Sequence, residues 1–224
     1  MAVKLATISI FRPTTKRAAK DSLCSITSTV GKATNPQRSS PWNLSAAAGT
    51  QSPCSSHAHV TGNVWDIPNA PMDIEELIPH INSTYRTIPS REGRTITGFS
   101  MGGGVAASMA FKYPDLFSSV VAYAGTYHHY YHPDYSTVGT PVDQAAGIYE
   151  KMMAEKKFFH GSIIQRLIVN ADIIRNSVKI SLHVGTADIL YCDNEILHLH
   201  LNALQIPHEY RKYPDGDHNL SLIL

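Results

Sequence analysis

Residues Gly93–Gly104 have the sequence GRTITGFSMGGG, which is the most informative segment of this chain about its fold. Residues 94–97 read as a short strand, and residues 104–113 carry the apolar spacing of a helix. Between them, the segment Gly98-Phe-Ser-Met-Gly102 matches G-x-S-x-G, in which a serine sits on a strained strand-to-helix turn with its hydroxyl exposed above a sheet. The order strand, tight turn, helix therefore predicts that Ser100 is a nucleophile at the edge of a sheet.

A purely structural role is the competing interpretation of this motif. A glycine-rich turn that only tightens the packing of a helix on a strand would account for Gly102 and Gly103. It would leave the serine without a role. The nucleophile is therefore the interpretation that uses every residue of the motif.

Downstream of this turn, strand-like and helix-like segments alternate. We expect strands over 118–124, 178–184 and 208–213, with helices over 194–204 and, upstream, over 72–86. Such alternation is typical of an α/β fold with a mostly parallel sheet flanked by helices. A largely helical insertion over about 143–176 precedes the third strand, and insertions at this point commonly form a cap over the site.

The beginning of the chain has a different composition. Up to residue 65 it holds seven Lys and Arg against one acid, Asp21, and many Ser, Thr and Ala. We therefore predict that residues 1–64 are a poorly ordered or targeting segment and that residues 65–224 form one catalytic domain. The best strand candidates before this boundary are Lys4–Phe11 and His59–Trp65. No clear signal peptide is recognisable, so a secreted and a cytoplasmic location both stay open.

The overall composition excludes several classes of function. A net charge of +1 gives no electrostatic case for nucleic acid as the partner. No apolar run reaches the roughly 18 residues of a membrane-spanning helix, and we expect no membrane partner. Three cysteines without a CxxC pair argue against a zinc ribbon or a disulfide scaffold, although one bridge between Cys24 and Cys54 stays open. The oligomeric state is not addressed by any of these features.

A serine nucleophile needs a histidine to take its proton and a carboxylate to hold that histidine. Asp188 follows the strand predicted over 178–184 and is the expected acid. Asp193 falls at the start of the next helix, where capping is the simpler interpretation, and Asp172 is expected to be a solvated helix residue. His218 follows the last strand in a turn-forming cluster and is the expected base.

The run Thr126–His132, TYHHYYH, should border the same site because it follows the second strand. An aromatic pocket wall and an ordinary surface loop are equally compatible with it. We take Tyr127 and His128 as candidate substrate contacts. No pair of histidines has convincing metal spacing, so neither a metal nor another cofactor is expected.

These segments together resemble the putative-esterase family of α/β-hydrolases, which includes esterase D-like, feruloyl and acetylxylan esterases. The resemblance covers about residues 72–220 and is carried by ELIPHINSTYRT, GRTITGFSMGGG, FKYPDLFSSVVAYAG, HVGTADIL and the closing GDH. It implies a cofactor-free serine carboxylesterase with Ser100, Asp188 and His218 as its triad. The GFSMGG form is most similar to enzymes that cleave feruloyl or acetyl esters of plant cell-wall polysaccharide, so the expected partner is a small or polysaccharide-linked ester.

The chain differs from that family in the part that precedes the turn at Ser100. Members carry several strands there, one of which ends in a His-Gly type loop that donates an N–H to the oxyanion, and no such loop is recognisable here. The backbone amide of Met101 supplies one donor and the second is unassigned. The alternatives to an esterase are therefore a catalytically impaired hydrolase-fold protein that binds acyl or sugar ligands, and an acyltransferase or thioester hydrolase on the same triad.

Overall fold

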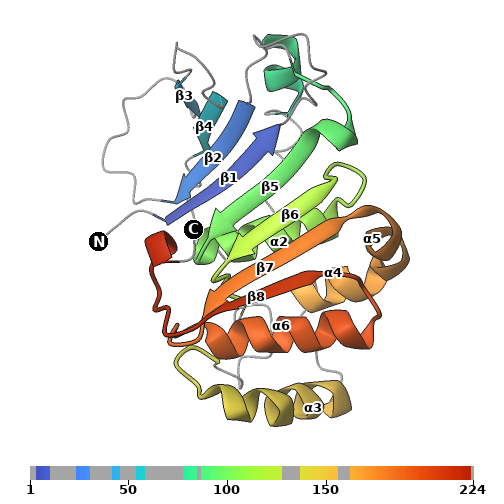
Figure 1. Cartoon of the computed structure of the whole chain (residues 1–224). Coiled ribbons are helices and arrows are strands. Elements are labelled where there is room, and N and C mark those ends of the chain that lie inside the picture. The colour runs from blue at the N-terminus through green and yellow to red at the C-terminus, as the bar shows by residue number, and fades with distance from the viewer. Residues whose placement is uncertain are drawn as a thin grey trace.

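The sheet is the organising element of the fold. The computed structural model describes residues 4–10, 24–30, 42–45, 54–58, 78–84, 87–127, 137–155 and 162–222. Within these residues eight strands form one sheet in the order β3-β4-β2-β1-β5-β6-β7-β8 (Figure 1). The strands are β1 Lys4–Ile10, β2 Cys24–Val30, β3 Trp42–Ser45, β4 Cys54–Ala58, β5 Arg94–Phe99, β6 Ser119–Tyr123, β7 Lys179–Gly185 and β8 Glu209–Tyr213.

Helices separate the parallel strands of the second half. They are α2 Met101–Lys112, α3 Ala145–Glu155, α4 Ile163–Val169, α5 Ala171–Ser177 and α6 Tyr191–Ala203, and residues 78–84 form a further helix within the predicted range 72–86. β5, β6, β7 and β8 pair in parallel, in chain order. Parallel neighbours need a crossover between them, and helices supply it in each case. The predicted strands, the helix over 194–204 and the α/β class are confirmed.

Four strands of the sheet come from the segment before residue 65. β1 pairs antiparallel with both β2 and β5, and β2 pairs with β4 in a register that sets Cys24 opposite Cys54. The strand expected over 4–11 is therefore found, whereas 59–65 lies outside the described residues. β1 supplies the partner that the outer backbone groups of β5 need, whatever the composition of that partner. The domain boundary at residue 65 stays a prediction. A targeting role stays a prediction.

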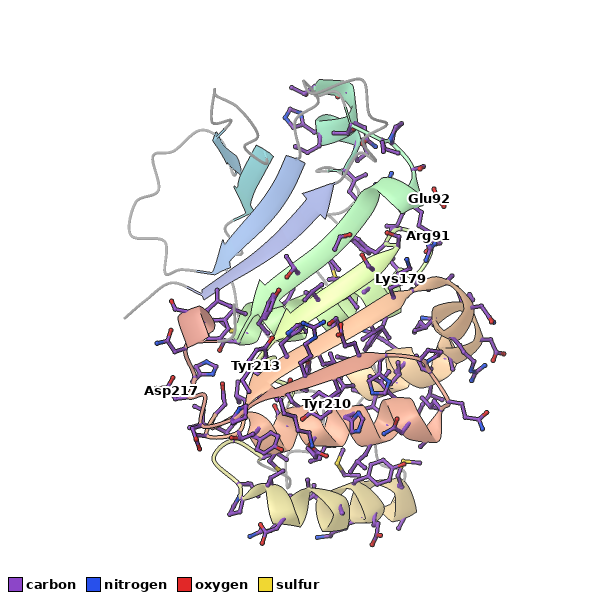
Figure 2. All side chains as sticks on the ribbon, viewed as in Figure 1. Arg91, Glu92, Lys179, Tyr210, Tyr213 and Asp217 are labelled. Atoms are coloured by element: carbon purple, nitrogen blue, oxygen red, sulfur yellow. The ribbon has the colours of Figure 1, made fainter. Side chains whose placement is uncertain are left out.

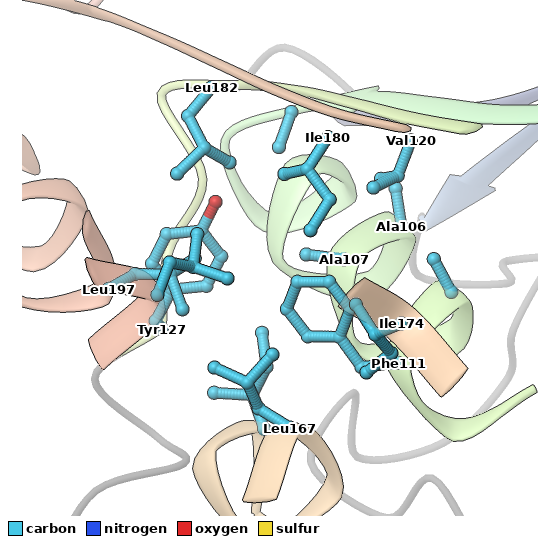
Figure 3. Packing of buried hydrophobic residues seen from close by; sticks show 14 of the residues in the cluster. Ala106, Ala107, Phe111, Val120, Tyr127, Leu167, Ile174, Ile180, Leu182 and Leu197 are labelled. Carbon is cyan, nitrogen blue, oxygen red and sulfur yellow. The ribbon is translucent and has the colours of Figure 1, made fainter. Parts of the chain in front are cut away.

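The large apolar core of the described residues lies between the parallel strands and the helices. α2 lies behind β5 and β6 in Figure 1, and Figure 3 shows Phe111 of α2 among residues from β6, β7 and the later helices. The predicted insertion is helical, but its described helices add to this core. Met152, Ile163, Ile164, Leu167 and Ile174 are all at most 3% exposed within it. α4 packs on α2 and α3 on α6, so the described helices of the insertion extend the core, and a cap over the site stays a prediction.

None of the helices in the described ranges combines the length and apolar character needed to cross a lipid bilayer.

A buried histidine in α6 makes the fold sensitive to acid. His200 is 2% exposed and its ring meets that of Tyr149 edge-on at 4.9 Å. Burial lowers the pKa of His200 from 6.5 to about 4. The unfolded chain therefore takes up a proton at this side chain at a higher pH than the folded chain does. Stability contributed by the neutral ring is complete above about pH 6.5 and is lost as the pH falls toward 4.

We expect His200→Gln to flatten the acid limb of the stability curve. The parent should lose about 3 kcal/mol of unfolding free energy through this one group between neutral and acid pH, and the variant should not. Urea unfolding at about pH 7 and about pH 4 measures the difference. The exposed His80→Gln is the matched control. Equal acid losses in the parent and in His200→Gln would contradict the prediction.

Candidate active site

Ser100 occupies the sharp turn between β5 and α2. Its backbone has φ 58° and ψ −122°, in the left-handed half of the map that a non-glycine residue adopts only under strain. The turn is held by three backbone bonds. The Ser100 amide donates to the carbonyl of Tyr123 at 2.8 Å, and its own carbonyl accepts from Gly104 and Thr126, both at 3.1 Å. The strain is therefore maintained by the neighbouring strand β6 and the loop after it.

The glycines around Ser100 are required by close backbone approach. A Cβ at Gly98 would lie 2.2 Å from the carbonyl oxygen of Gly102, and a Cβ at Gly104 would lie 2.1 Å from that of Thr126. Both distances are far inside van der Waals contact. The sequence G-F-S-M-G-G-G is thus needed for the strand, the turn and the following loop to meet.

Asp188 and His218 lie on two loops at the same end of the sheet as Ser100. Figure 2 shows Arg91 and Lys179 at one end of the parallel strands and Tyr213 and Asp217 at the other. Asp188 follows β7 through a turn in which its amide donates to Gly185, and His218 follows β8. Because parallel strands end at the same edge, loops after β5, β7 and β8 converge there.

The three side chains form one continuous hydrogen-bonded row. Nδ1 of His218 lies 2.8 Å from Oδ2 and 3.0 Å from Oδ1 of Asp188, and its Nε2 lies 2.8 Å from Oγ of Ser100. The Asp188 side chain is fully buried and that of His218 is 20% exposed. A carboxylate only accepts, so Nδ1 carries the proton and Nε2 accepts from the serine hydroxyl. The tertiary structure thus brings together the three residues expected from the sequence.

One donor for an oxyanion follows from the position of Met101. It is the first residue of α2, and the first amides of a helix have no partner within the helix. The direction of β1, the strand beside β5, decides whether its C-terminal end could supply the second oxyanion donor. β1 runs antiparallel to β5, with Ile10 paired to Arg94, so β1 ends beside the start of β5, away from Ser100. The last residue of β1, Ile10, therefore does not supply the second N–H.

The expectation for Tyr127 changes, and that for His128 is not tested. Tyr127 is fully buried, and Figure 3 shows its ring in the core near Leu182 and Leu197, so it is a packing residue and not a substrate contact. A tyrosine ring that follows a buried strand is pulled into the core by its large apolar area. His128 lies outside the described residues.

The role of Asp193 also differs from the helix cap predicted from the sequence. It lies inside the first turn of α6 with no exposed surface, and the N-cap position belongs to Leu190. Its carboxylate accepts from the amide of Tyr127 and from the hydroxyl of Thr137. Asp172, in contrast, is an exposed helix residue as predicted, paired with Arg175. Nothing in the local sequence distinguishes a cap from a carboxylate that binds a loop some 60 residues upstream.

Cys192 is a buried free thiol and does not compete with Ser100 as a nucleophile. Burial raises the pKa of the Cys192 thiol to about 11, which keeps it protonated and unreactive at neutral pH. Within the described ranges no group of three or more His, Cys, Asp or Glu side chains could hold a metal ion.

The loops of the acid and the base touch through two glycines, which gives a test of the site's packing. A Cβ at Gly185 would lie 2.0 Å from the carbonyl oxygen of Gly216, two residues before His218. We expect Gly185→Ala to cost about 1–3 kcal/mol of stability and to displace His218 from Asp188. Thermal unfolding measures the first effect. Gly147→Ala, in α3 with open space around it, is the control and should be stabilising by about 0.5–1 kcal/mol.

A strained serine at a strand-to-helix turn, joined to a histidine and a buried aspartate from later strands, defines the serine hydrolase class of site on an α/β-hydrolase fold. Residues 72–221 match the family described as "Putative esterase", and the chain belongs to that family.

Curated relatives share only a short segment with this chain. The esterases Rv1288 and MT1326 of Mycobacterium tuberculosis are 40% identical over 52 residues, which are 23% of this chain and 11% of those proteins. The chain thus matches about a tenth of the length of these relatives. The similarity supports the family and says nothing of the rest of those proteins.

Solved structures share the fold. A ferulic acid esterase superposes with a TM-score of 0.55 at 22% identity, over 76% of this chain and 65% of that one. The S-formylglutathione hydrolase FrmB of Staphylococcus aureus gives a TM-score of 0.53 at 15% identity, over 75% and 63%. At these identities the likeness shows the α/β fold alone.

Proposed function

We propose that this protein is a serine carboxylic ester hydrolase that works through an acyl-enzyme. The observation that carries the proposal is the row of hydrogen bonds from Ser100 through His218 to Asp188, with both links at 2.8 Å. Distances in this range let a proton move from the hydroxyl to the imidazole as the serine attacks. Membership of the putative esterase family supports the same reaction.

The chemistry follows from the positions of these groups. Ser100 Oγ attacks the ester carbonyl carbon while His218 Nε2 takes its proton, and the charge formed on the imidazole is balanced by Asp188. The negative carbonyl oxygen meets the amide of Met101 at the start of α2. His218 then protonates the alcohol as it leaves. Water, activated by the same histidine, releases the acid and restores Ser100.

The substrates we propose are feruloyl or acetyl esters of plant cell-wall polysaccharide. The similarity of the GFSMGG segment to enzymes of that kind supports this choice, as does the fold shared with a ferulic acid esterase. Purified protein should hydrolyse methyl ferulate or p-nitrophenyl acetate, and the change in absorbance measures each reaction. Preference for one over the other separates the feruloyl from the acetyl proposal. A correctly folded protein that hydrolyses neither would overturn the esterase proposal.

A second candidate is a slow or catalytically impaired member of the fold that binds acyl or sugar ligands. The antiparallel placement of β1 beside β5 favours it, because β1 ends beside Arg94, at the end of β5 away from Ser100. Loss of one oxyanion donor costs about 100- to 1000-fold in rate. If calorimetry shows that the protein binds ferulic acid while its turnover stays close to background, this candidate is supported over the first.

A further inference from the structure

A second set of contacts joins the loop of the nucleophile to the loop of the acid without passing through His218. It begins at Asp193 and Asn194, consecutive residues in the first turn of α6. Both side chains belong to residues with no exposed surface. Burying a carboxylate and an amide is costly unless their hydrogen bonds are made, so their partners show what these side chains do.

Asn194 binds two loops with one amide group. Its Nδ2 donates to the carbonyl of Gly125 at 2.9 Å and to that of Leu190 at 2.8 Å. Leu190 in turn donates its own amide to Oδ1 of Asp188 at 2.7 Å. The side chain of Asn194 therefore connects the loop after β6 to the turn that orients the acid.

The other end of this connection reaches the nucleophile. The residue after Gly125 is Thr126, whose amide donates to the carbonyl of Ser100 at 3.1 Å. A Cβ at Gly103 would lie 3.0 Å from the Cα of Gly125, so the loop is also pressed against the first turn of α2. Backbone bonds to Ser100 and side-chain bonds to α6 thus leave this loop little freedom to move.

Asp193 binds the same loop at Tyr127, the next residue after Thr126. Its Oδ2 accepts from the amide of Tyr127 at 2.6 Å, and its Oδ1 accepts from the hydroxyl of Thr137. Three successive residues, 125 to 127, are therefore bound by Asn194, by Ser100 and by Asp193 in turn.

We propose that Asp193 and Asn194 are positioning residues, which form a buried brace that sets the distance between Ser100 and Asp188. The inference rests on the proposed roles of those two residues. His218 arrives on a separate loop after β8 and must bond to both with a rigid ring of fixed span. If the serine and acid loops drift apart, one of its two 2.8 Å bonds must lengthen. A displacement of this kind far from the reacting atoms reduces the rate more than it changes binding.

The test compares Asn194→Ala with Asn170→Ala. Asn170 makes the same kind of bond, from Nδ2 to the carbonyl of Phe111 at 2.7 Å, but at the far end of α2. The readouts are the second-order rate at which a fluorophosphonate labels Ser100, and kcat and KM on p-nitrophenyl acetate, all measured below the unfolding temperature of each variant. Asn194→Ala should lower the labelling rate and kcat by about 10- to 100-fold with little change in KM, and Asn170→Ala should retain both rates.

A second pair of variants keeps the test decisive if Asn194→Ala does not fold. Asp193→Asn has the same shape and still accepts from Tyr127, so it should keep most of the labelling rate, whereas Asp193→Leu should lose it. Equal losses in the two asparagine variants, or full rates in both variants at Asp193, would overturn the brace.

The labelling reaction also separates this inference from the proposed function. A fluorophosphonate reports on the nucleophile and its base and does not require a carboxylic ester to be the substrate. A parent that is labelled but hydrolyses no ester would overturn the esterase and leave the brace to be decided by the variants. A parent that is not labelled would overturn the brace together with the nucleophile.

Discussion

Replacing Ser100 with alanine should lower kcat for ester hydrolysis by about 10⁴- to 10⁶-fold and abolish labelling by a fluorophosphonate. The hydroxyl is the group that forms the acyl-enzyme, and it is the partner of His218 Nε2 at 2.8 Å. Alanine removes this one atom and leaves the backbone bonds of the turn in place. Water activated by the remaining histidine is the only nucleophile left, and it has no covalent intermediate to divide the barrier.

Initial rates on p-nitrophenyl acetate, with protein concentration corrected for folded fraction, measure the loss. Ser108→Ala is the matched control, because Ser108 is also fully buried and hydrogen-bonded but faces Arg166 on α4. It should cost stability and leave the activity of the folded protein unchanged. If Ser100→Ala hydrolysed the ester as fast as the parent, Ser100 would not be the nucleophile.

Asp188→Asn should reduce kcat by about 10⁴-fold, because it changes which ring nitrogen of His218 carries the proton. Leu190 donates its amide to Oδ1 of Asp188 at 2.7 Å, which will hold the amide oxygen of an asparagine in the same place. The new NH₂ group then faces Nδ1 of His218 and donates to it. The imidazole is left with its proton on Nε2, where it cannot accept from Ser100.

The measurement is kcat and KM together with thermal unfolding. KM should change little, because the Asp188 side chain is fully buried and presents no surface to a substrate, and the fold should survive the isosteric exchange. Asp217→Asn is the control, since Asp217 is exposed and adjacent to His218 in the chain. Comparable losses in both variants would mean that charge near the histidine matters and that the specific partner does not.

Local features of the chain were sufficient to predict much of this site. The turn at Ser100 could be recognised because the steric requirements on Gly98, Ser100 and Gly102 come from residues close to them in the chain. Asp188 and His218 could be placed because each follows a strand of recognisable period, and parallel strands end at one edge of a sheet. These predictions required no knowledge of how distant segments pair.

The mistaken predictions concern residues whose role depends on distant partners. Asp193 has the local context of a helix cap, yet it binds Tyr127 and Thr137, which lie 66 and 56 residues before it in the chain. Tyr127 has the local context of a pocket wall, yet its ring lies in the core. Sequence spacing gives no measure of which loop will face a given side chain, so these roles could not be predicted.

Local sequence features were enough to predict the α/β fold, the strained turn at Ser100 and the order of nucleophile, acid and base. All of these depend on short-range sterics and on the period of apolar residues. Three features became visible in the folded structure: β1 runs antiparallel beside β5, the described insertion helices join the core, and Asp193 and Asn194 bind the loop after β6. These features arise from pairing of segments far apart in the chain, whose energies depend on contacts that no local pattern encodes.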